Sequence, residues 1–293
     1  MDGVLLIDKP AGWTSHDVVN RVRRLVNTRR VGHLGTLDPL ATGVLALVIE
    51  RATRLAQFFK HSDKHYDAVV RFGYSTDSYD RDGTPATPVR EVAMERAAVE
   101  AALEQFRGEI LQTPPSVSAK KVAGVPAYKM ARKKIPVELA PVVVTIHSLE
   151  LVDVTGALAR LRVHCSSGTY VRAIAHELGQ KLGCGAVLED LVRTQLADFR
   201  LEDCVTLDHL TTLAGEDHIA EVLLPCESLL PHFPSEYVDQ ITEGYIRHGR
   251  DFHVSPFRVR PGTRYVKAVS HAGRLLAIGE AKLPNLYHPI LVL

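Results

Sequence analysis

Apolar and polar residues alternate with the period of a β-strand in part of the chain. In residues 157–165, every second residue from Ala159 to Cys165 is apolar, and the residues between them are arginine or histidine. A period of two places the apolar side chains on one face of a strand. Short apolar or alternating runs predict further strands at residues 3–8, 44–49, 65–72 and 142–154.

Three other segments have helical spacing. Apolar residues recur every three to four positions in residues 15–27, 92–106 and 170–182, and Gly108 follows the second segment as a stop signal. These helices and the predicted strands mix without the regular rhythm of a doubly wound sheet. The pattern therefore favours an α+β fold.

A change of composition divides the chain near residue 230. Residues 201–243 contain ten acidic residues and no lysine or arginine, and Pro225, Pro231 and Pro234 lie in the same stretch. Residues 262–293 then predict short strands separated by turns. We therefore expect a large domain over residues 1–230 and a small β-rich domain over residues 235–293.

Composition places the chain among globular proteins. It has 293 residues, of which 46% are hydrophobic and 24% charged. The longest strictly apolar run, residues 44–49, is far shorter than the roughly 18 residues of a membrane span, and the N-terminus lacks a basic leader. We expect a cytoplasmic protein, whose four cysteines, without a C-x-x-C pair, are reduced thiols.

The formal net charge of +1 conceals separate blocks of charge. Residues 116–136 contain six lysines and arginines and no acid, and residues 244–293 contain eight basic residues against two acidic ones. Clustered positive charge suits phosphate binding, although a solvated surface has the same composition. The basic blocks are therefore compatible with a nucleic-acid partner.

Several common sites are missing from the sequence. It contains neither a P-loop nor a G-x-G-x-x-G dinucleotide turn, and His176-Glu177 lacks the second histidine of a zinc-binding H-E-x-x-H motif. The stretch Asp80-Arg81-Asp82-Gly83 is too short for a calcium loop and predicts a turn. We expect no metal and no cofactor.

The segment from Gly32 to Leu45 offers a candidate nucleophile. Asp38 precedes Pro39, which disfavours helix, and the glycines around it permit tight turns before the apolar run at residues 44–49. The carboxylate is thus expected on a shaped loop beside a buried strand. A turn aspartate that bonds its own backbone is the competing interpretation.

The same segment carries a family resemblance. It matches the signature G-H-x-G-T-L-D-P-x-A-x-G-V-L of the TruB family of tRNA pseudouridine synthases at every specified position. Blocks around Asp8–Gly12, Lys64–Tyr66, Pro114–Arg132 and Cys165–Arg172 resemble the family in the same order, so the resemblance covers about residues 3–200. The tail beyond residue 235 resembles a short PUA-type RNA-binding domain.

The resemblance implies a fold and an activity. It implies a mixed, largely antiparallel sheet with flanking helices, followed by a small PUA-like domain. It also implies isomerisation of uridine 55 in the T arm of tRNA to pseudouridine, by a protein that needs neither a cofactor nor a protein partner and acts as a monomer. The base must leave the stack, detach, rotate and rejoin the ribose through carbon.

The resemblance also assigns roles to single residues. Asp38 would be the nucleophile, attacking either the base or the sugar, and Arg172 would pair with it and keep it ionised. Tyr66 would stack on the extruded base and Leu191 would pack against it. His33 would assist extrusion of the base. Weaker substrate-binding candidates are Tyr170, Lys9, Lys121 and Arg132.

Departures from the family pattern affect RNA contacts rather than catalysis. Val192 and Ala197 replace residues that are commonly arginine and glycine, and Pro126 replaces a basic residue. Two alternatives compete with the synthase: an RNA-binding or tRNA-folding protein in which catalysis is secondary, and a uridine methyltransferase. The methyltransferase would need a glycine-rich donor loop and a nucleophilic cysteine, neither of which is evident.

Overall fold

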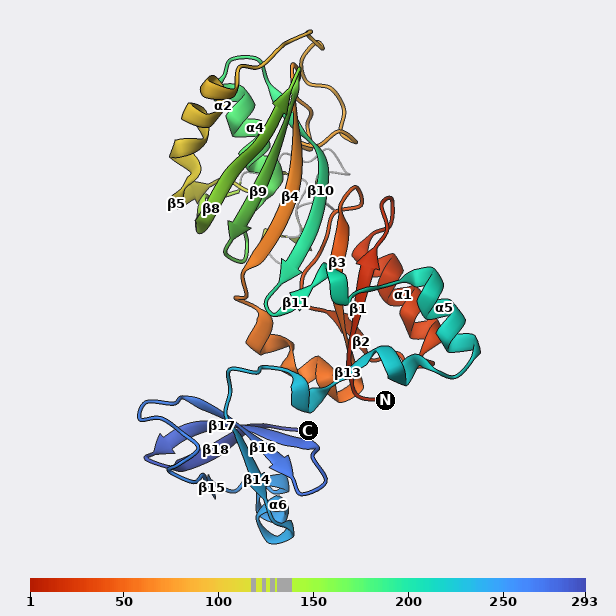
Figure 1. Ribbon diagram of the computed structural model, residues 1–293, viewed down its shortest axis with the longest axis vertical. Helices are drawn as coiled ribbons and strands as arrows, with labels where there is room; N and C mark the ends of the chain where they lie inside the picture. The colour runs from red at the N-terminus through yellow and green to blue at the C-terminus, as the bar shows by residue number, and fades with distance from the viewer. Residues whose placement is uncertain (117–119, 123–124, 127–129, 131–138) are drawn as a thin grey trace.

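The computed structural model describes residues 1–116, 120–122, 125–126, 130 and 139–293. These residues form an α+β fold with two main sheets, as the sequence predicts (Figure 1). Helices α1 (Ser15–Leu25) and α5 (Leu207–Gly215) lie beside one half of the larger sheet, and α2 (Arg96–Leu103) and α4 (Val171–Lys181) beside the other half. The mixed composition of sheets and helices therefore confirms the expected fold class.

The larger sheet has eleven strands, with the main order β12-β1-β3-β10-β4-β9-β8-β5. It is mixed: β1 pairs parallel with β12 and β3 pairs parallel with β10, whereas the other pairs are antiparallel. Its strands are β1 (Gly3–Lys9), β2 (Val31–His33), β3 (Thr42–Ile49), β4 (Lys64–Phe72), β5 (Gly108–Gln112), β8 (Val142–Thr155), β9 (Leu158–Cys165), β10 (Ala186–Leu196), β11 (Phe199–Arg200), β12 (Val205–Thr206) and β13 (Leu223–Pro225).

Burial on both faces explains why residues 4–7 of strand β1 are all apolar rather than alternating. Leu5 and Ile7 belong to the main core with α1, whereas Val4 and Leu6 belong to a second apolar cluster on the opposite face. Both faces of the strand are therefore covered. Full burial of such side chains contributes about 1.5–3 kcal/mol each, which explains an unbroken hydrophobic run.

The second apolar cluster joins the larger sheet to the C-terminal sheet. It includes Phe59 from the 3-10 helix η1 (Glu50–Phe59) together with Ile278 and Leu291 from the C-terminal strands. That sheet has the order β14-β16-β17-β18-β15. The elements of this part are β14 (Ser235–Val238), α6 (Gln240–Arg247), β15 (Phe252–His253), β16 (Tyr265–Ser270), β17 (Leu275–Leu283) and β18 (Leu286–Val292).

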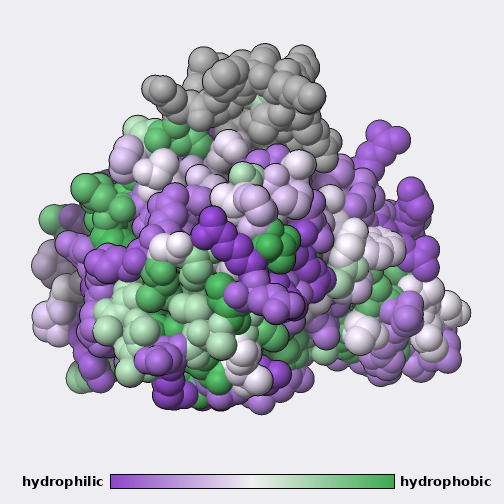
Figure 2. Space-filling view, turned by 90° about the horizontal axis from the view of Figure 1, so that it is seen from above, coloured by the Kyte–Doolittle hydropathy of each residue, from purple (hydrophilic) through white to green (hydrophobic). Residues whose placement is uncertain are grey.

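The remaining elements are short. A two-stranded sheet pairs β6 (Lys121–Val122) with β7 (Val125–Pro126). Four further 3-10 turns are η2 (Glu104–Phe106), η3 (Leu201–Asp203), η4 (Ile219–Val222) and η5 (Cys226–Ser228). In the view along the long axis, hydrophilic residues surround smaller hydrophobic groups (Figure 2). Among the described residues, no helix is both long and apolar enough to cross a membrane.

Three local predictions differ from the structure. The helix expected over residues 92–106 begins only at Arg96 and tightens to 3-10 geometry at Glu104. Residues 31–33, expected in a loop, form the edge strand β2. The long strand β10 was not predicted, because Glu189 and Asp190 interrupt its apolar pattern and lie where its pairing with β4 shifts register.

Gly43 lies where strands β3 and β10 meet, and replacing it by Ala is expected to destabilise the protein. Its φ is +95°, and an added Cβ would lie 2.3 Å from the Arg193 carbonyl oxygen. We expect the free energy of unfolding to fall by about 2–4 kcal/mol, since the left-handed conformation alone costs an alanine about 1–2 kcal/mol. Urea unfolding measures this change.

Gly156→Ala is the matched control. Gly156 also has a positive φ, but no atom lies within 4 Å of its added Cβ. Its replacement should therefore show the conformational penalty alone. Equal losses in the two variants would contradict the steric explanation.

Candidate active site

The loop between β2 and β3 carries Asp38, and short hydrogen bonds hold it in place. The Ser15 hydroxyl accepts the Leu37 N–H at 2.8 Å and donates to the Leu37 carbonyl at 3.0 Å. The Gly12 N–H donates to the Pro39 carbonyl at 2.8 Å. Residues on both sides of Asp38 are thus tied to the start of α1 and to the turn that precedes it.

Two buried cations brace the same loop from inside. The Arg193 guanidinium, fully buried on β10, donates to three carbonyl oxygens, including those of Gly35 at 3.0 Å and Val44 at 2.8 Å. The Lys9 ammonium donates to the carbonyls of Trp13 at 2.6 Å and Pro39 at 3.3 Å. Burial lowers the pKa of Lys9 to about 8. These contacts favour a bracing role for both residues.

Arg172 from the first turn of α4 grips the Asp38 carboxylate with two nitrogens. Its Nε lies 2.8 Å from Oδ2, and its Nη2 donates to Oδ1 at 3.1 Å. The arginine side chain is 4% exposed, whereas that of Asp38 is 32% exposed. A fork-shaped pair of this kind fixes the orientation of a carboxylate. The Asp38 carboxylate is therefore partly exposed to solvent, while the arginine that holds it is buried.

A second carboxylate, that of Asp80, also contacts Arg172, and the sequence did not predict this contact. Its Oδ2 lies 3.5 Å from Arg172 Nη1, and the same nitrogen donates to the Ser78 carbonyl at 2.9 Å. Burial raises the pKa of Asp80, against the opposing effects of the Ser78 hydroxyl and the Arg172 guanidinium. The residue does lie in a turn, as expected, but its carboxylate also contacts the arginine that holds Asp38.

A cavity of about 250 Å³ opens at Asp38. It is smaller than most ligand pockets, which measure roughly 300–1,000 Å³, and its size suits one nucleobase better than a large cofactor. Tyr66 from β4 and Leu191 from β10 line it, and burial raises the pKa of Tyr66. Five of the candidate residues share this cavity: Asp38, Tyr66, Tyr170, Arg172 and Leu191.

Tyr170 is positioned by its backbone. Its N–H donates to the Gln112 side-chain oxygen at 2.8 Å, and its carbonyl accepts from the Gln112 amide at 3.1 Å. Gln112 is buried on β5, so this double contact fixes the start of α4 against the far edge of the sheet. The arrangement sets where Arg172, two residues later, enters the site.

The remaining candidates lie elsewhere or outside the described residues. His33 ends β2 and is not among the cavity-lining residues; burial lowers its pKa, and its Nδ1 has no hydrogen-bond partner within the described part of the chain. The backbone of Lys121 lies in β6, but its side chain is not described, and Arg132 lies outside the described residues. Their roles stay predictions.

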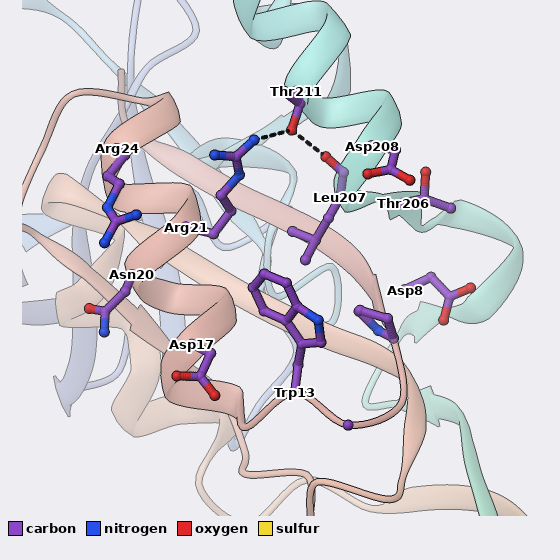
Figure 3. A pocket seen from close by; sticks show the side chains of 12 residues that line it. Asp8, Trp13, Asp17, Asn20, Arg21, Arg24, Thr206, Leu207, Asp208 and Thr211 are labelled. Atoms are coloured by element: carbon purple, nitrogen blue, oxygen red, sulfur yellow. Dashed lines mark hydrogen bonds between the residues drawn. The ribbon is translucent and has the colours of Figure 1, made fainter.

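A larger cavity, about 870 Å³, lies between α1 and α5. Figure 3 shows the Trp13 indole between the two helices. It also shows the Arg21 guanidinium, which donates a hydrogen bond to the Thr211 hydroxyl at 3.1 Å. Its lining includes three carboxylates, those of Asp8, Asp17 and Asp208. This mixed charge suits phosphates poorly, so the smaller cavity at Asp38 is the better candidate for a nucleotide.

Lys64 also lines the smaller cavity at Asp38, and the titration of its amine leads to a prediction for stability. Burial, assisted by the nearby Arg193, lowers its pKa from 10.5 to about 8. The unfolded chain then binds more protons than the folded protein between these values, so this lysine increases stability as the pH rises from 8 to 10.5. One pKa unit corresponds to about 1.4 kcal/mol, so the change in the free energy of unfolding is at most about 4 kcal/mol.

The stability of Lys64→Met relative to the wild type should show this dependence. We expect the variant's relative stability in urea unfolding to decline steadily from pH 8 to pH 10.5, because it lacks the titrating amine. Tyrosines and other lysines titrate in both proteins, so their effects cancel in the difference. A difference that does not vary with pH would contradict the lowered pKa.

Comparisons with known proteins show the family of the chain. Residues 23–171 match the family model described as TruB family pseudouridylate synthase (N terminal domain), and residues 172–231 match the tRNA pseudouridylate synthase B C-terminal domain. A tRNA pseudouridine synthase B from Solibacter usitatus is 59% identical over the full length of both chains. Its counterpart from Stutzerimonas stutzeri is 41% identical, over 96% of this chain and 92% of that protein.

Solved structures support the fold. A chain from an H/ACA ribonucleoprotein bound to a substrate RNA containing 2'-deoxyuridine superposes with a TM-score of 0.72 at 23% identity, over 99% of this chain and 84% of that chain. A chain from the archaeal box H/ACA Nop10-Cbf5 complex gives the same TM-score at 24% identity, over 99% of this chain and 85% of that chain. At such identity the likeness shows the fold alone. By its matched family models and full-length relatives, the chain belongs to the TruB family of pseudouridine synthases.

Proposed function

We propose that this protein converts uridine 55 in the T arm of tRNA to pseudouridine. The observation that carries the proposal is the Asp38 carboxylate, gripped by Arg172 and open to a cavity of nucleobase size. A carboxylate held in this way is a competent nucleophile toward a nucleoside. The names of the relatives, tRNA pseudouridine synthase B, support tRNA as the substrate.

In the proposed reaction, the target base leaves the stack and enters the cavity. Tyr66 would stack on it, and Leu191 would exclude water from its edge. Asp38 would form a transient covalent bond while the glycosidic bond to nitrogen breaks. That bond to Asp38 would break again as the base rejoins the ribose through carbon, which releases its proton to water, and the freed ring nitrogen would take up a proton. Base and ribose both remain in the product, so the balance requires no cofactor.

The direct test is incubation of the purified protein with unmodified tRNA, followed by site-resolved detection of pseudouridine. We expect one pseudouridine, at position 55, and none in a matched tRNA with cytidine there. Modification at other positions only would overturn the proposed specificity. Tight tRNA binding without any product would instead favour the alternative of an RNA-binding or tRNA-folding protein.

We further propose that residues 1–230 form the catalytic domain and residues 235–293 an RNA-binding domain, acting together as a monomer without an obligatory protein partner. The separate five-stranded sheet, which begins at Ser235, supports this division. Eight basic residues between 244 and 293 suit contacts with phosphates.

The basic segment around Lys120 and Lys121 is expected to contact the RNA backbone. Replacing both lysines by Ala should reduce the slope of log affinity against log salt by roughly 1 for each phosphate that the variant no longer neutralises. Filter binding at several salt concentrations measures the slope. Lys181→Ala, at the end of α4 far from Arg172, is the control; an unchanged slope in the double variant would exclude the segment from the RNA-binding surface.

A further inference from the structure

A cluster of histidines and one aspartate lies next to the active-site strand but outside the cavity at Asp38. Asp63 Oδ1 lies 3.2 Å from His147 Nε2, and Asp63 Oδ2 lies 3.6 Å from His164 Nε2. One ligand atom from each of these three residues lies within 4.8 Å of the other two. We infer that Asp63, His147 and His164 form a binding site for a divalent transition-metal ion such as Zn²⁺.

The distances match metal coordination. Zn–N and Zn–O bonds of about 2.0–2.2 Å place neighbouring ligand atoms of a tetrahedral site roughly 3.3–3.5 Å apart. Asp63 contacts the two rings through different oxygens, at 3.2 Å from Oδ1 and 3.6 Å from Oδ2, and one ligand atom from each of the three residues lies within 4.8 Å of the others, so small side-chain movements would reach that spacing. Two imidazoles and one carboxylate select zinc, cobalt or nickel over Mg²⁺ and Ca²⁺, which prefer oxygen ligands.

The sheet register explains why these side chains meet. His65 on β4 pairs directly with His164 on β9, so both rings project from the same face. Lys64 and Tyr66, the neighbours of His65, project from the opposite face and line the cavity at Asp38. The β8–β9 pairing shifts between Ile146 and Ser148, so His147 is the extra residue of a bulge. Bulges commonly re-aim a side chain.

The histidine rings are already held in place. His65 stacks on His164 with ring centroids 4.0 Å apart and an angle of 11° between the planes. The His147 ring lies 4.5 Å from that of His164. Because His65 supports His164 from one side, the His164 ring loses little freedom on binding a metal. The side chains of Asp63, His147 and His164 are 46%, 36% and 30% exposed, which leaves room for water as a further ligand.

The sequence did not indicate this site. Asp63 lies in a loop about 80 residues before the two histidines, which come from the consecutive strands β8 and β9, so the set lacks the close spacing by which zinc motifs are recognised. A bound metal would join β8 and β9 to the segment that leads into β4, the strand carrying Tyr66. It would thereby stiffen the strand behind the cavity from the opposite face. This inference does not depend on the proposed RNA substrate.

Titration of metal-free, full-length protein with Co²⁺ tests the site. Tetrahedral Co²⁺ absorbs visible light strongly, so the wild type should develop a saturable band at one ion per chain, and Zn²⁺ should abolish it by displacement. His147→Gln and His164→Gln should each weaken binding at least tenfold. His61→Gln removes an exposed histidine beside the cluster and should bind like the wild type.

Thermal unfolding provides a second readout, since a ligand that binds the folded state raises Tm. Zn²⁺ should raise the Tm of the wild type and of His61→Gln, but not that of His164→Gln. Circular dichroism without metal checks that the variants fold. Absence of saturable binding by the wild type, wild-type affinity in either cluster variant, or a near-ultraviolet thiolate band indicating cysteine ligands would each overturn the site.

Discussion

Asp38→Asn is expected to abolish product formation while leaving tRNA binding almost unchanged. The amide has nearly the shape of the carboxylate but cannot act as a nucleophile. Removal of a nucleophile commonly lowers kcat by about 10⁴-fold or more. Binding should survive, because contacts with phosphates dominate the affinity for nucleic acids. Tritium release or site-resolved detection of pseudouridine measures the rate, and filter binding measures the affinity.

Asp67→Asn is the matched control for this experiment. Asp67 lies on β4 next to Tyr66, is exposed, and forms an ion pair with Arg162 at 3.7 Å on the outer face of the sheet. Its replacement should change neither rate nor affinity by more than about twofold, because exposed ion pairs contribute little. Wild-type turnover in Asp38→Asn would remove the aspartate from the mechanism.

Local patterns in the sequence predicted those elements whose burial is regular. Strand β9 alternates because one face contacts the core, and residues 4–7 of β1 are all apolar because both faces of the strand are covered. Apolar residues at helical spacing predicted the helix over residues 15–27, which forms as α1. In each case the signal lies within a few residues, so no long-range contact had to be known.

Strand β10 could not be predicted in this way. It lies at the centre of the larger sheet, but Glu189 sits at a register shift, where it pairs with Arg71 at 2.8 Å. A strand with an irregular register presents charge where a regular strand would present an apolar residue. Its place between β3 and β4 depends on pairing with segments more than a hundred residues away, which no local pattern reports.

The residues of the candidate site were likewise predicted only in part. The signature from Gly32 to Leu45 identified Asp38, and the resemblance indicated Arg172 as its partner. Asp80 was predicted only as a turn residue, because local hydrogen bonds with Ser78 and Asp82 account for the turn. Its contact with Arg172 forms only in the folded chain. Tertiary contacts, rather than motifs, thus reveal the second carboxylate.

Arg172→Met is expected to lower both activity and stability. It would leave Asp38 and Asp80 without the cation between them, one of them buried. Breaking a buried ion pair by removing one partner costs about 3–5 kcal/mol. Arg172→Lys keeps the charge but loses the two-pronged contact, so we expect kcat to fall by about 10²–10³-fold with a smaller loss of stability. Urea unfolding and single-turnover rates separate the two effects.

The double variant Arg172→Met/Asp80→Asn should recover part of the stability that Arg172→Met loses, because it removes one of the two uncompensated carboxylates. Residues in one ion-pair network commonly show interaction energies of about 0.5–3 kcal/mol. The single variant Asp80→Asn completes the cycle. Activity should remain low in the double variant, since Asp38 still lacks the guanidinium that orients it. If the stability losses of the single variants simply add, Arg172 and Asp80 do not interact, and Asp80 has no part in holding Asp38.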